Sequence, residues 1–503
     1  MRKNFIIYVT IIAASIAFRL ALFYPSFFPN ADAGEYAAFV HEIAMNGGFL
    51  PSYNSIYFPG SNYIYPPFLF YVTYIIWIPV SRILPDSPYS MLYILLGIAI
   101  FAGSIMNALI YRYAAHYKTG FLNFICIIIP VFFSIDIYSL TWGGFPFIVD
   151  LLFFVAVLLY LEKDKWNAAD IAVITLLSAA VPLTHDLTWF IFEIAVFLIL
   201  LFNILKHRSY RVKQSLLVLS VSSALGLYWW LPRLKFVLSA FFVSQSYGSG
   251  PFTSTAGQSV DLLLVALYLL PVIFMSFLEI VGTIRNRKME NVDSFTLAMI
   301  STAVGIIFIT RDIVLTARII LYTYTFLMIV VLKNLHLLED AVRGLKRSDI
   351  IKKLKFAALI MLVVAIPGQL YTGVYSTHFY SSGEYQYDPG LIKWASSNMV
   401  NGTIGAPLIG NYLAGVDGLP VILYSGFIVG GNQINERNAV IDLILFPNAN
   451  FTVQEVEKYH ITYIVVQNNY INSTVDSHLL TFSSSPFHFM RRFSYYTVYS
   501  IGY

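Results

Sequence analysis

The chain has 503 residues, of which 58% are hydrophobic and only 12% are charged, and its formal net charge at pH 7 is +4. A soluble globular protein carries about 25% charged residues, so this composition excludes a soluble enzyme and predicts a polytopic α-helical membrane protein. The single cysteine, Cys126, excludes an intramolecular disulfide framework and a cysteine-rich metal site. We expect membrane lipids as partners and no nucleic acid.

Twelve apolar runs close to the length of a membrane span follow one another along the chain. They cover residues 4–24, 68–84, 91–111, 120–138, 146–162, 168–184, 187–204, 214–230, 259–283, 294–309, 316–332 and 355–373. The first run begins after Met1-Arg2-Lys3 and has no small-residue cleavage site behind it, which indicates a true span and not a cleaved signal peptide.

Basic residues mark one side of the membrane, because short loops rich in Lys and Arg stay cytoplasmic. Twenty of the 31 basic residues lie at the N-terminus or in the loops 112–118, 163–165, 206–213, 285–288 and 333–355. From residue 112 onward two runs separate each basic loop from the next, so all these loops can be cytoplasmic together. Three runs precede residue 112, however, and three crossings would place that loop outside.

The run at 68–84 is the best candidate for a helix that does not cross the membrane. It follows Pro66-Pro67, contains Trp77 and several tyrosines, and ends at Arg82, which is typical of a juxtamembrane helix. We therefore predict about eleven membrane-spanning helices, a cytoplasmic N-terminus and an extracytoplasmic C-terminal segment.

The segment 374–503 is the only extended polar stretch. All three Asn-x-Ser/Thr sequons lie in it, and none falls in a loop that we place in the cytoplasm. Short apolar runs at 420–424 and 461–466 predict strands, and residues 388–399 predict a helix. The segment therefore predicts a small external α/β domain that follows a transmembrane domain over residues 1–373.

The first outer loop, within residues 25–90, is expected to hold two juxtamembrane helices. Its part up to residue 67 contains no Lys or Arg but holds Asp32, Glu35 and Glu42. Apolar residues at helical spacing over 34–46 predict a helix with one apolar face that lies on the membrane. Asp32 and Glu35 would stand at its start. A long loop beside short turns is more often functional than passive.

Other ionisable residues stand where later runs begin or end, and an ionisable group at membrane depth is by default a functional hypothesis. They are Asp136, His185, Asp186, Arg233, Arg311 and Arg318. Plainer interpretations exist: an isolated external acid is more often simply solvated, and His185-Asp186 fits a self-satisfied turn. Their combination on one side of the membrane favours a site.

This set of residues suits chemistry on a lipid-linked phosphate. Cations neutralise the phosphate and stabilise the negative charge that builds on it as it leaves, a role for the three arginines. A carboxylate within hydrogen-bond reach of an incoming hydroxyl acts as a base, a role for Asp32 or Glu35. Phosphate leaves readily, so no strong acid is required, and aromatic loop residues can stack on a sugar ring.

Four short motifs stand within residues 1–235: Arg19-Leu20, Asp32-Ala33-Gly34-Glu35-Tyr36, Gly47-Gly48 and Tyr63-Ile64-Tyr65-Pro66-Pro67-Phe68-Leu69-Phe70-Tyr71. On these motifs the sequence resembles the GT-C superfamily of membrane glycosyltransferases, which use polyprenyl-phosphate-linked sugars and include protein O-mannosyltransferases and aminoarabinose transferases. The chain departs from the aminoarabinose branch at Tyr65, where a Lys or Arg is typical. It also lacks a Trp-Trp-Asp-Tyr-Gly signature in the C-terminal segment, which argues against an oligosaccharyltransferase.

The resemblance implies a GT-C fold, a catalytic acid at Asp32 with support from Glu35 and Asp136, and phosphate binding by outer basic residues. We assign Tyr65, His185 and Asp186 to substrate binding together with the three arginines. No cofactor is certain; family members differ in metal dependence, and a divalent cation would bind Asp32 and Asp136.

We therefore predict an inverting glycosyltransferase that moves a sugar from a polyprenyl-phosphate donor to a glycan, lipid or protein acceptor on the extracytoplasmic face, with Asp32 as the base. The alternative is a transporter or flippase of lipid-linked glycans, which predicts charges near the bilayer centre and inverted repeats. A third hypothesis is a non-catalytic anchor for the external domain.

Overall fold

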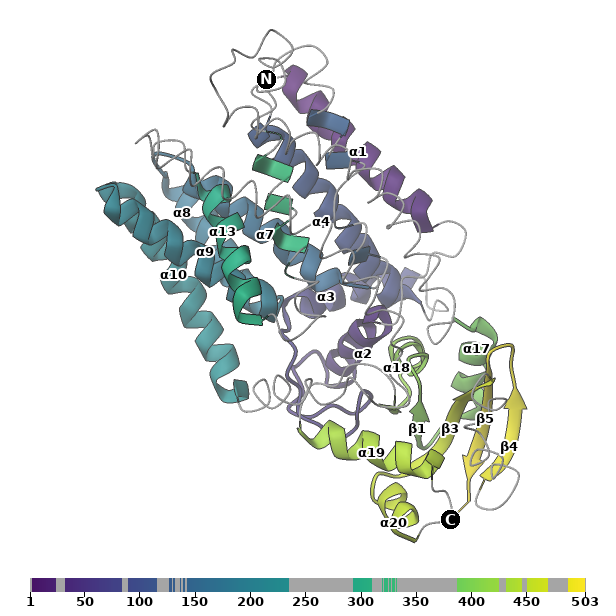
Figure 1. The fold of residues 1–503 in the computed structure, drawn as a ribbon. Helices are drawn as coiled ribbons and strands as arrows, with labels where there is room; N and C mark the ends of the chain where they lie inside the picture. The colour runs from purple at the N-terminus through teal and green to yellow at the C-terminus, as the bar shows by residue number, and fades with distance from the viewer. Residues whose placement is uncertain are drawn as a thin grey trace, which may run out of the picture.

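The structure is a computed structural model. It describes residues 2–23, 32–83, 89–114, 143–234, 293–309, 387–424, 431–445, 450–468 and 487–502, and the isolated positions 126–128, 130–131, 136, 139–140, 319, 321–323, 325–326, 328–330 and 332. A layer of long apolar helices carries a small sheet domain at one end, and the N-terminus lies at the other end (Figure 1).

The helical layer follows the apolar runs of the sequence. Its helices are α1 (Arg2–Phe23), α3 (Phe68–Ile83), α4 (Ser90–Ala114), α7 (Phe145–Leu161), α8 (Ala168–Ala180), α9 (Asp186–Leu205), α10 (Ser209–Trp230) and α13 (Ser294–Ile309), with the one-turn helices η1 (Val181–Leu183) and η2 (Leu231–Arg233). Helix α2 (Asp32–Met45) lies between this layer and the sheet domain.

Three helical segments of the described residues are long and apolar enough to cross a membrane: Ser90–Tyr113, Asp186–Leu205 and Ser209–Arg233. Shorter apolar helices cover Phe5–Ala21, Phe68–Ile83, Phe145–Leu161, Ala168–Leu183 and Leu321–Val330. The chain is an integral membrane protein. The predicted total of eleven spans includes runs at 259–283 and 355–373 that lie outside the described residues, so that number stays a prediction.

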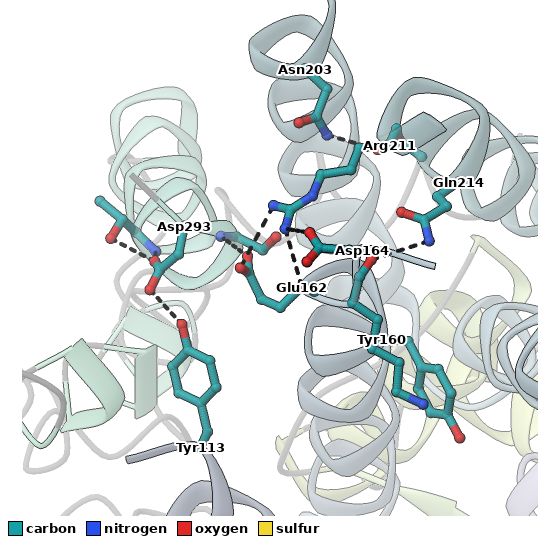
Figure 2. A network of polar contacts seen from close by, with 12 residues as sticks. Tyr113, Tyr160, Glu162, Asp164, Asn203, Arg211, Gln214 and Asp293 are labelled. Atoms are coloured by element: carbon teal, nitrogen blue, oxygen red, sulfur yellow. Dashed lines mark hydrogen bonds and ion pairs between the residues drawn. The ribbon is translucent and has the colours of Figure 1, made fainter. Parts of the chain in front are cut away.

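The described parts of three basic loops, 112–114, 163–165 and 206–213, lie close together beside the start of α13 (Figure 2). Arg211, at the start of α10, donates to the Glu162 carbonyl oxygen after α7, and the Glu162 carboxylate accepts the Ser294 N–H at the start of α13 at 2.7 Å. Tyr113, at the end of α4, donates its hydroxyl to Asp293. The described loops that were predicted to share one side therefore do lie together. Which side of a membrane they face stays a prediction.

Helix α3 does not run from one end of the layer to the other. Before it, Tyr57 pairs with Val421 of the C-terminal sheet. After it, the Tyr387 hydroxyl donates to the Tyr89 hydroxyl at 3.1 Å. Both flanks of α3 thus lie at the end that carries the sheet domain, which is what the count of basic loops required. Its place on a membrane surface stays a prediction.

The C-terminal sheet has five strands in the order β2-β1-β3-β5-β4. They are β1 (Thr403–Ala406), β2 (Val421–Leu423), β3 (Ile461–Gln467), β4 (Phe487–Arg492) and β5 (Tyr496–Ile501), with the helices α17 (Pro389–Asn398), α18 (Gly410–Asp417), α19 (Gly431–Leu445) and α20 (Asn450–Lys458). The first three strands pair in parallel and the last two antiparallel. The strands predicted at 420–424 and 461–466 and the helix predicted at 388–399 are confirmed.

The first loop closes the β2 edge of this sheet. Phe58 donates its N–H to the Val421 carbonyl oxygen at 2.8 Å, and Val421 donates to the Ile56 carbonyl oxygen at 2.7 Å. Glu42 of α2 holds the loop in place: its carboxylate accepts the Ser55 N–H and the Ser55 hydroxyl, both at 2.6 Å, and also the Ile56 N–H. One buried carboxylate therefore joins α2, the loop and the sheet edge.

Replacing Glu42 by alanine should destabilise this joint, because the buried Ile56 N–H loses its charged acceptor. Hydrogen bonds to charged groups are worth about 1.5–3 kcal/mol, so we expect a lower thermal midpoint in detergent and faster chymotrypsin cleavage between residues 46 and 67. Glu457→Ala, which removes an exposed acid on α20, is the control. Equal cleavage rates in the two variants would contradict the assigned role of Glu42.

Candidate functional site

Helix α2 presents its two first acids on one face. Asp32 and Glu35 stand three residues apart in its first turn, which places them side by side. Both are partly exposed, whereas Ala33, Gly34 and Tyr36 are buried. Acids at a helix N-terminus are favoured by the helix dipole. The carboxylates therefore form a negative, partly exposed corner at the start of a helix that is mostly buried.

The sequence predicts one apolar face for α2, and the burial of the helix extends beyond that face. Its place on a membrane surface stays a prediction. Residues on all sides of the helix are buried, including Ala37, Ala38, Phe39 and Val40. Helices α3 and α4 pack against one side of α2, and α18 of the C-terminal domain packs against another (Figure 1). The sequence pattern missed the second contact because small residues such as Ala37 and Ala38 carry little hydrophobic signal.

Two tyrosines of the first loop face the acids. Tyr57 donates a hydrogen bond to Glu35, and its pKa is raised well above the usual range by burial first and then by the charges of Glu35 and Asp32. Tyr65 donates to the Tyr36 hydroxyl at 3.2 Å. Burial, Tyr36 and then Asp186 raise the pKa of Tyr65 in the same way. Both phenols therefore stay neutral and act as hydrogen-bond donors.

Arg233 reaches the same loop from the end of α10. Its guanidinium lies 3.6 Å over the Trp229 ring, Nη1 donates to the Trp229 carbonyl oxygen at 2.8 Å, and Nε donates to the Tyr63 carbonyl oxygen at 3.4 Å. Arg233 remains partly exposed. The short segment from Tyr63 to Tyr65 thus connects Arg233 to the acidic corner at Asp32 and Glu35.

His185 and Asp186 differ in their surroundings. His185 is 2% exposed and caps α9, where its Nδ1 accepts the Thr188 N–H at 3.3 Å. Its geometry fits the self-satisfied turn that the sequence also allowed. The Asp186 side chain is 55% exposed, and its charge acts on Tyr65. Of this pair, Asp186 is the one that joins the acidic corner.

Asp136 is fully buried and bound to Arg19. Its Oδ2 accepts the Arg19 Nε–H and its Oδ1 accepts an Nη2–H, both at 2.7 Å, and Arg19 Nη1 donates to the Ser15 carbonyl oxygen. Such a bidentate pair occupies both carboxylate oxygens. The pairing does not support the predicted catalytic role of Asp136, nor a divalent cation held between it and Asp32, because the guanidinium already neutralises the carboxylate.

Two of the predicted substrate-binding residues, Arg311 and Arg318, lie outside the described residues. Within them, no group of three or more His, Cys, Asp or Glu side chains is arranged to hold a metal ion.

Sequence reasoning missed two residues of the corner, Tyr57 and Tyr412. Tyr57 stood unmarked among the many aromatic residues of the first loop. Tyr412 belongs to α18, and burial followed by the charge of Asp32 raises its pKa. No local pattern links residue 412 to residue 32, so only the folded chain brings them together.

Comparison with known proteins gives a fold and no sequence relative. No family model matches the chain, and no curated protein matches it. The structure is similar to the archaeal oligosaccharyltransferase AglB from Archaeoglobus fulgidus in complex with an inhibitory peptide and a dolichol-phosphate, with a TM-score of 0.57 and 13% identity over 98% of this chain and 74% of that one.

A second match is ArnT from Cupriavidus metallidurans bound to undecaprenyl phosphate, with a TM-score of 0.50 and 12% identity over 97% of each chain. The chain has the GT-C fold. This confirms the fold that the short motifs of the first loop implied. At such low identity the likeness extends to the fold alone.

Removing one partner of the Arg19–Asp136 pair should be far more harmful than removing both. Asp136→Asn leaves a buried guanidinium uncompensated, which costs about 3–5 kcal/mol, whereas apolar replacement of a whole buried pair is often neutral. We expect a clear loss of thermal stability in detergent for Asp136→Asn and recovery in Arg19→Met/Asp136→Leu. A double variant less stable than the single one would show that the pair does not act in this way.

His41 should make the protein less stable in acid. It lies on α2, hydrogen-bonds to the Gly415 backbone of α18, and burial lowers its pKa from 6.5 to about 4. Because the unfolded state takes up the proton first, stability is lost as the pH falls from 6.5 towards 4.

Between pH 7 and pH 5, the change in thermal midpoint in detergent should therefore be less favourable for the wild type than for His41→Gln. His207→Asn, at an exposed position in the loop after α9, should keep the wild-type pH dependence. If His41→Gln also keeps it, His41 is not the group responsible.

Proposed function

We propose that the chain is a membrane glycosyltransferase that moves a sugar from a polyprenyl-phosphate-linked donor to an acceptor hydroxyl. The observation that carries the proposal is the partly exposed acidic corner of α2, in a GT-C fold, with neutral tyrosines and Arg233 on the same loop. The solved structures of AglB and ArnT hold dolichol-phosphate and undecaprenyl phosphate, which supports a donor of this class.

The reaction needs a base, and we assign this role to Asp32. The acceptor oxygen attacks the anomeric carbon while its proton moves to the Asp32 carboxylate. The new C–O bond forms as the bond from the anomeric carbon to the phosphate oxygen breaks, and the electron pair leaves with the phosphate. Attack from the face opposite the phosphate inverts the anomeric centre. Glu35, held by Tyr57, orients the acceptor.

The leaving phosphate needs a cation that does not move during the reaction. Arg233 is held by two backbone carbonyl oxygens and the Trp229 ring, so its guanidinium is preorganised for the charge that builds on the phosphate. Arg311 and Arg318 are proposed as its partners from the sequence. The acceptor would enter on the extracytoplasmic side, opposite the basic loops. A divalent cation would bind Asp32 and Glu35. Adding EDTA to the transfer assay tests whether the reaction needs one.

The transporter hypothesis predicts charges that line a pathway through the helices. Asp136 and Arg19 instead neutralise each other. Glu193 of α9 accepts hydrogen bonds from Trp189, Ser222 and Ser223 at 2.6–2.8 Å, which fixes it between α9 and α10. Charges bound to protein partners in this way favour a static helical layer, so we prefer glycosyl transfer.

Asp32→Asn should lower the rate of glycosyl transfer by about 10²–10⁴-fold, the usual contribution of a general base, with normal expression and thermal stability. The measurement is mass spectrometry of surface glycans and of polyprenyl-phosphate sugars in cells that express the wild type or the variant. Asp164→Asn, at a side chain that is 90% exposed beside Arg211, is the matched control. Wild-type glycosyl transfer by Asp32→Asn would contradict the assignment of Asp32 as the base.

A further inference from the structure

Helices α2 and α18 meet backbone to backbone, at a glycine on each side. A Cβ atom added at Gly34 would lie 2.5 Å from the carbonyl carbon and oxygen of Asn411, and one added at Gly415 would overlap the Gly34 carbonyl oxygen. Glycine allows such an approach because it has no side chain. Neither position can take even alanine without moving one helix against the other.

The contact continues along one face of α2. The Cβ atom built at Gly415 would lie 3.0 Å from the Ala37 Cβ, and His41 hydrogen-bonds to the Gly415 backbone. Positions 34, 37 and 41 recur at helical spacing. Gly418, at φ 65°, ends α18 in the left-handed conformation. Helix α18 thus packs against the face of α2 that holds positions 34, 37 and 41.

The same helix reaches the acidic corner itself. Gly34 stands between Asp32 and Glu35 in the sequence, so a shift of α18 at Gly34 displaces both carboxylates. Tyr412 of α18 is buried, and its backbone nitrogen would lie 2.8 Å from a Cβ atom added at Gly34. Its ring packs against Tyr387 with 5.4 Å between centroids. The place of the acids is therefore set by a segment of the C-terminal domain.

Resting on the proposed function, we propose that α18 is a positioning element of the glycosyl-transfer site: Gly415 and Tyr412 hold the first turn of α2 so that Asp32 meets the acceptor hydroxyl. Arg233 contacts the first loop and α10 rather than α18. Positioning of the base and binding of the donor phosphate are thus carried by different elements. A change in α18 should affect the chemical step and leave donor binding intact.

The test compares Gly415→Ala with Gly97→Ala, a helical glycine of α4 whose added Cβ would meet no atom within 4 Å. Transfer is assayed with the purified full chain and polyprenyl-phosphate sugars extracted from membranes in which the wild type is active. Displacing a catalytic group by an ångström costs about 100-fold, so we expect Gly415→Ala to lower kcat by that order. Its KM for the donor should stay within about twofold, and Gly97→Ala should match the wild type.

Tyr412→Phe provides a second test in case the Gly415 variant fails to fold, because it keeps the ring and removes only the hydroxyl on which the charge of Asp32 acts. It should lower kcat without raising the donor KM. A tyrosine that only stabilises the fold would leave the kcat of the folded enzyme at the wild-type value.

The outcomes separate this inference from the proposed function. Full activity of Asp32→Asn would remove both. An inactive Asp32→Asn, together with wild-type kcat in folded Gly415→Ala and in Tyr412→Phe, would overturn the positioning role alone. A raised donor KM at unchanged kcat would also overturn it, because α18 would then bind the donor and not place the base.

Discussion

The burial of α2 is the constraint on which the arrangement of this protein depends. A helix of fourteen residues is too short to span a bilayer, and in isolation such a length is marginal in water. It persists because α3 and α4 cover one side and α18 covers another. The membrane helices and the C-terminal sheet are consequently not independent bodies joined by a linker: both build their contacts on the same short helix, and its open N-terminal turn is where the acids emerge.

Several of the charged residues that the structure describes differ in their partners. The Arg19–Asp136 pair is fully buried and Glu193 is half-buried, and hydrogen bonds hold all three side chains, which offsets the cost of removing a charge from water. At the end near the sheet, Asp186 and Arg233 remain partly exposed. A charged side chain that is held by protein hydrogen bonds stabilises the fold, whereas a partly exposed one can still contact a substrate. The surroundings of each charged residue therefore indicate its role, which the residue type alone does not.

Much of the helical layer was predictable, because apolar runs and basic loops are local signals. The number of basic loops correctly required that both flanks of 68–84 lie at the same end of the helical layer. Short apolar runs predicted β2 and β3. The partners of the acids were not predictable. The sequence suggests Asp136 as a second catalytic acid. It does not reveal that Arg19, 117 residues earlier, binds the Asp136 carboxylate. Similarly, nothing in the sequence around Tyr412 points to Asp32, since pairing between distant segments leaves no periodic mark.

The pairing of the first loop with the edge of β2 bears on how the chain is assembled. Val421 is synthesised long after Ile56 and Phe58, so the loop that carries the aromatic residues waits for its sheet partner while every helix between them is made and inserted. Contacts so distant along the chain form slowly. The acidic corner is thus completed only when the last domain has folded, and an unfinished or truncated chain would reach the membrane without an assembled centre.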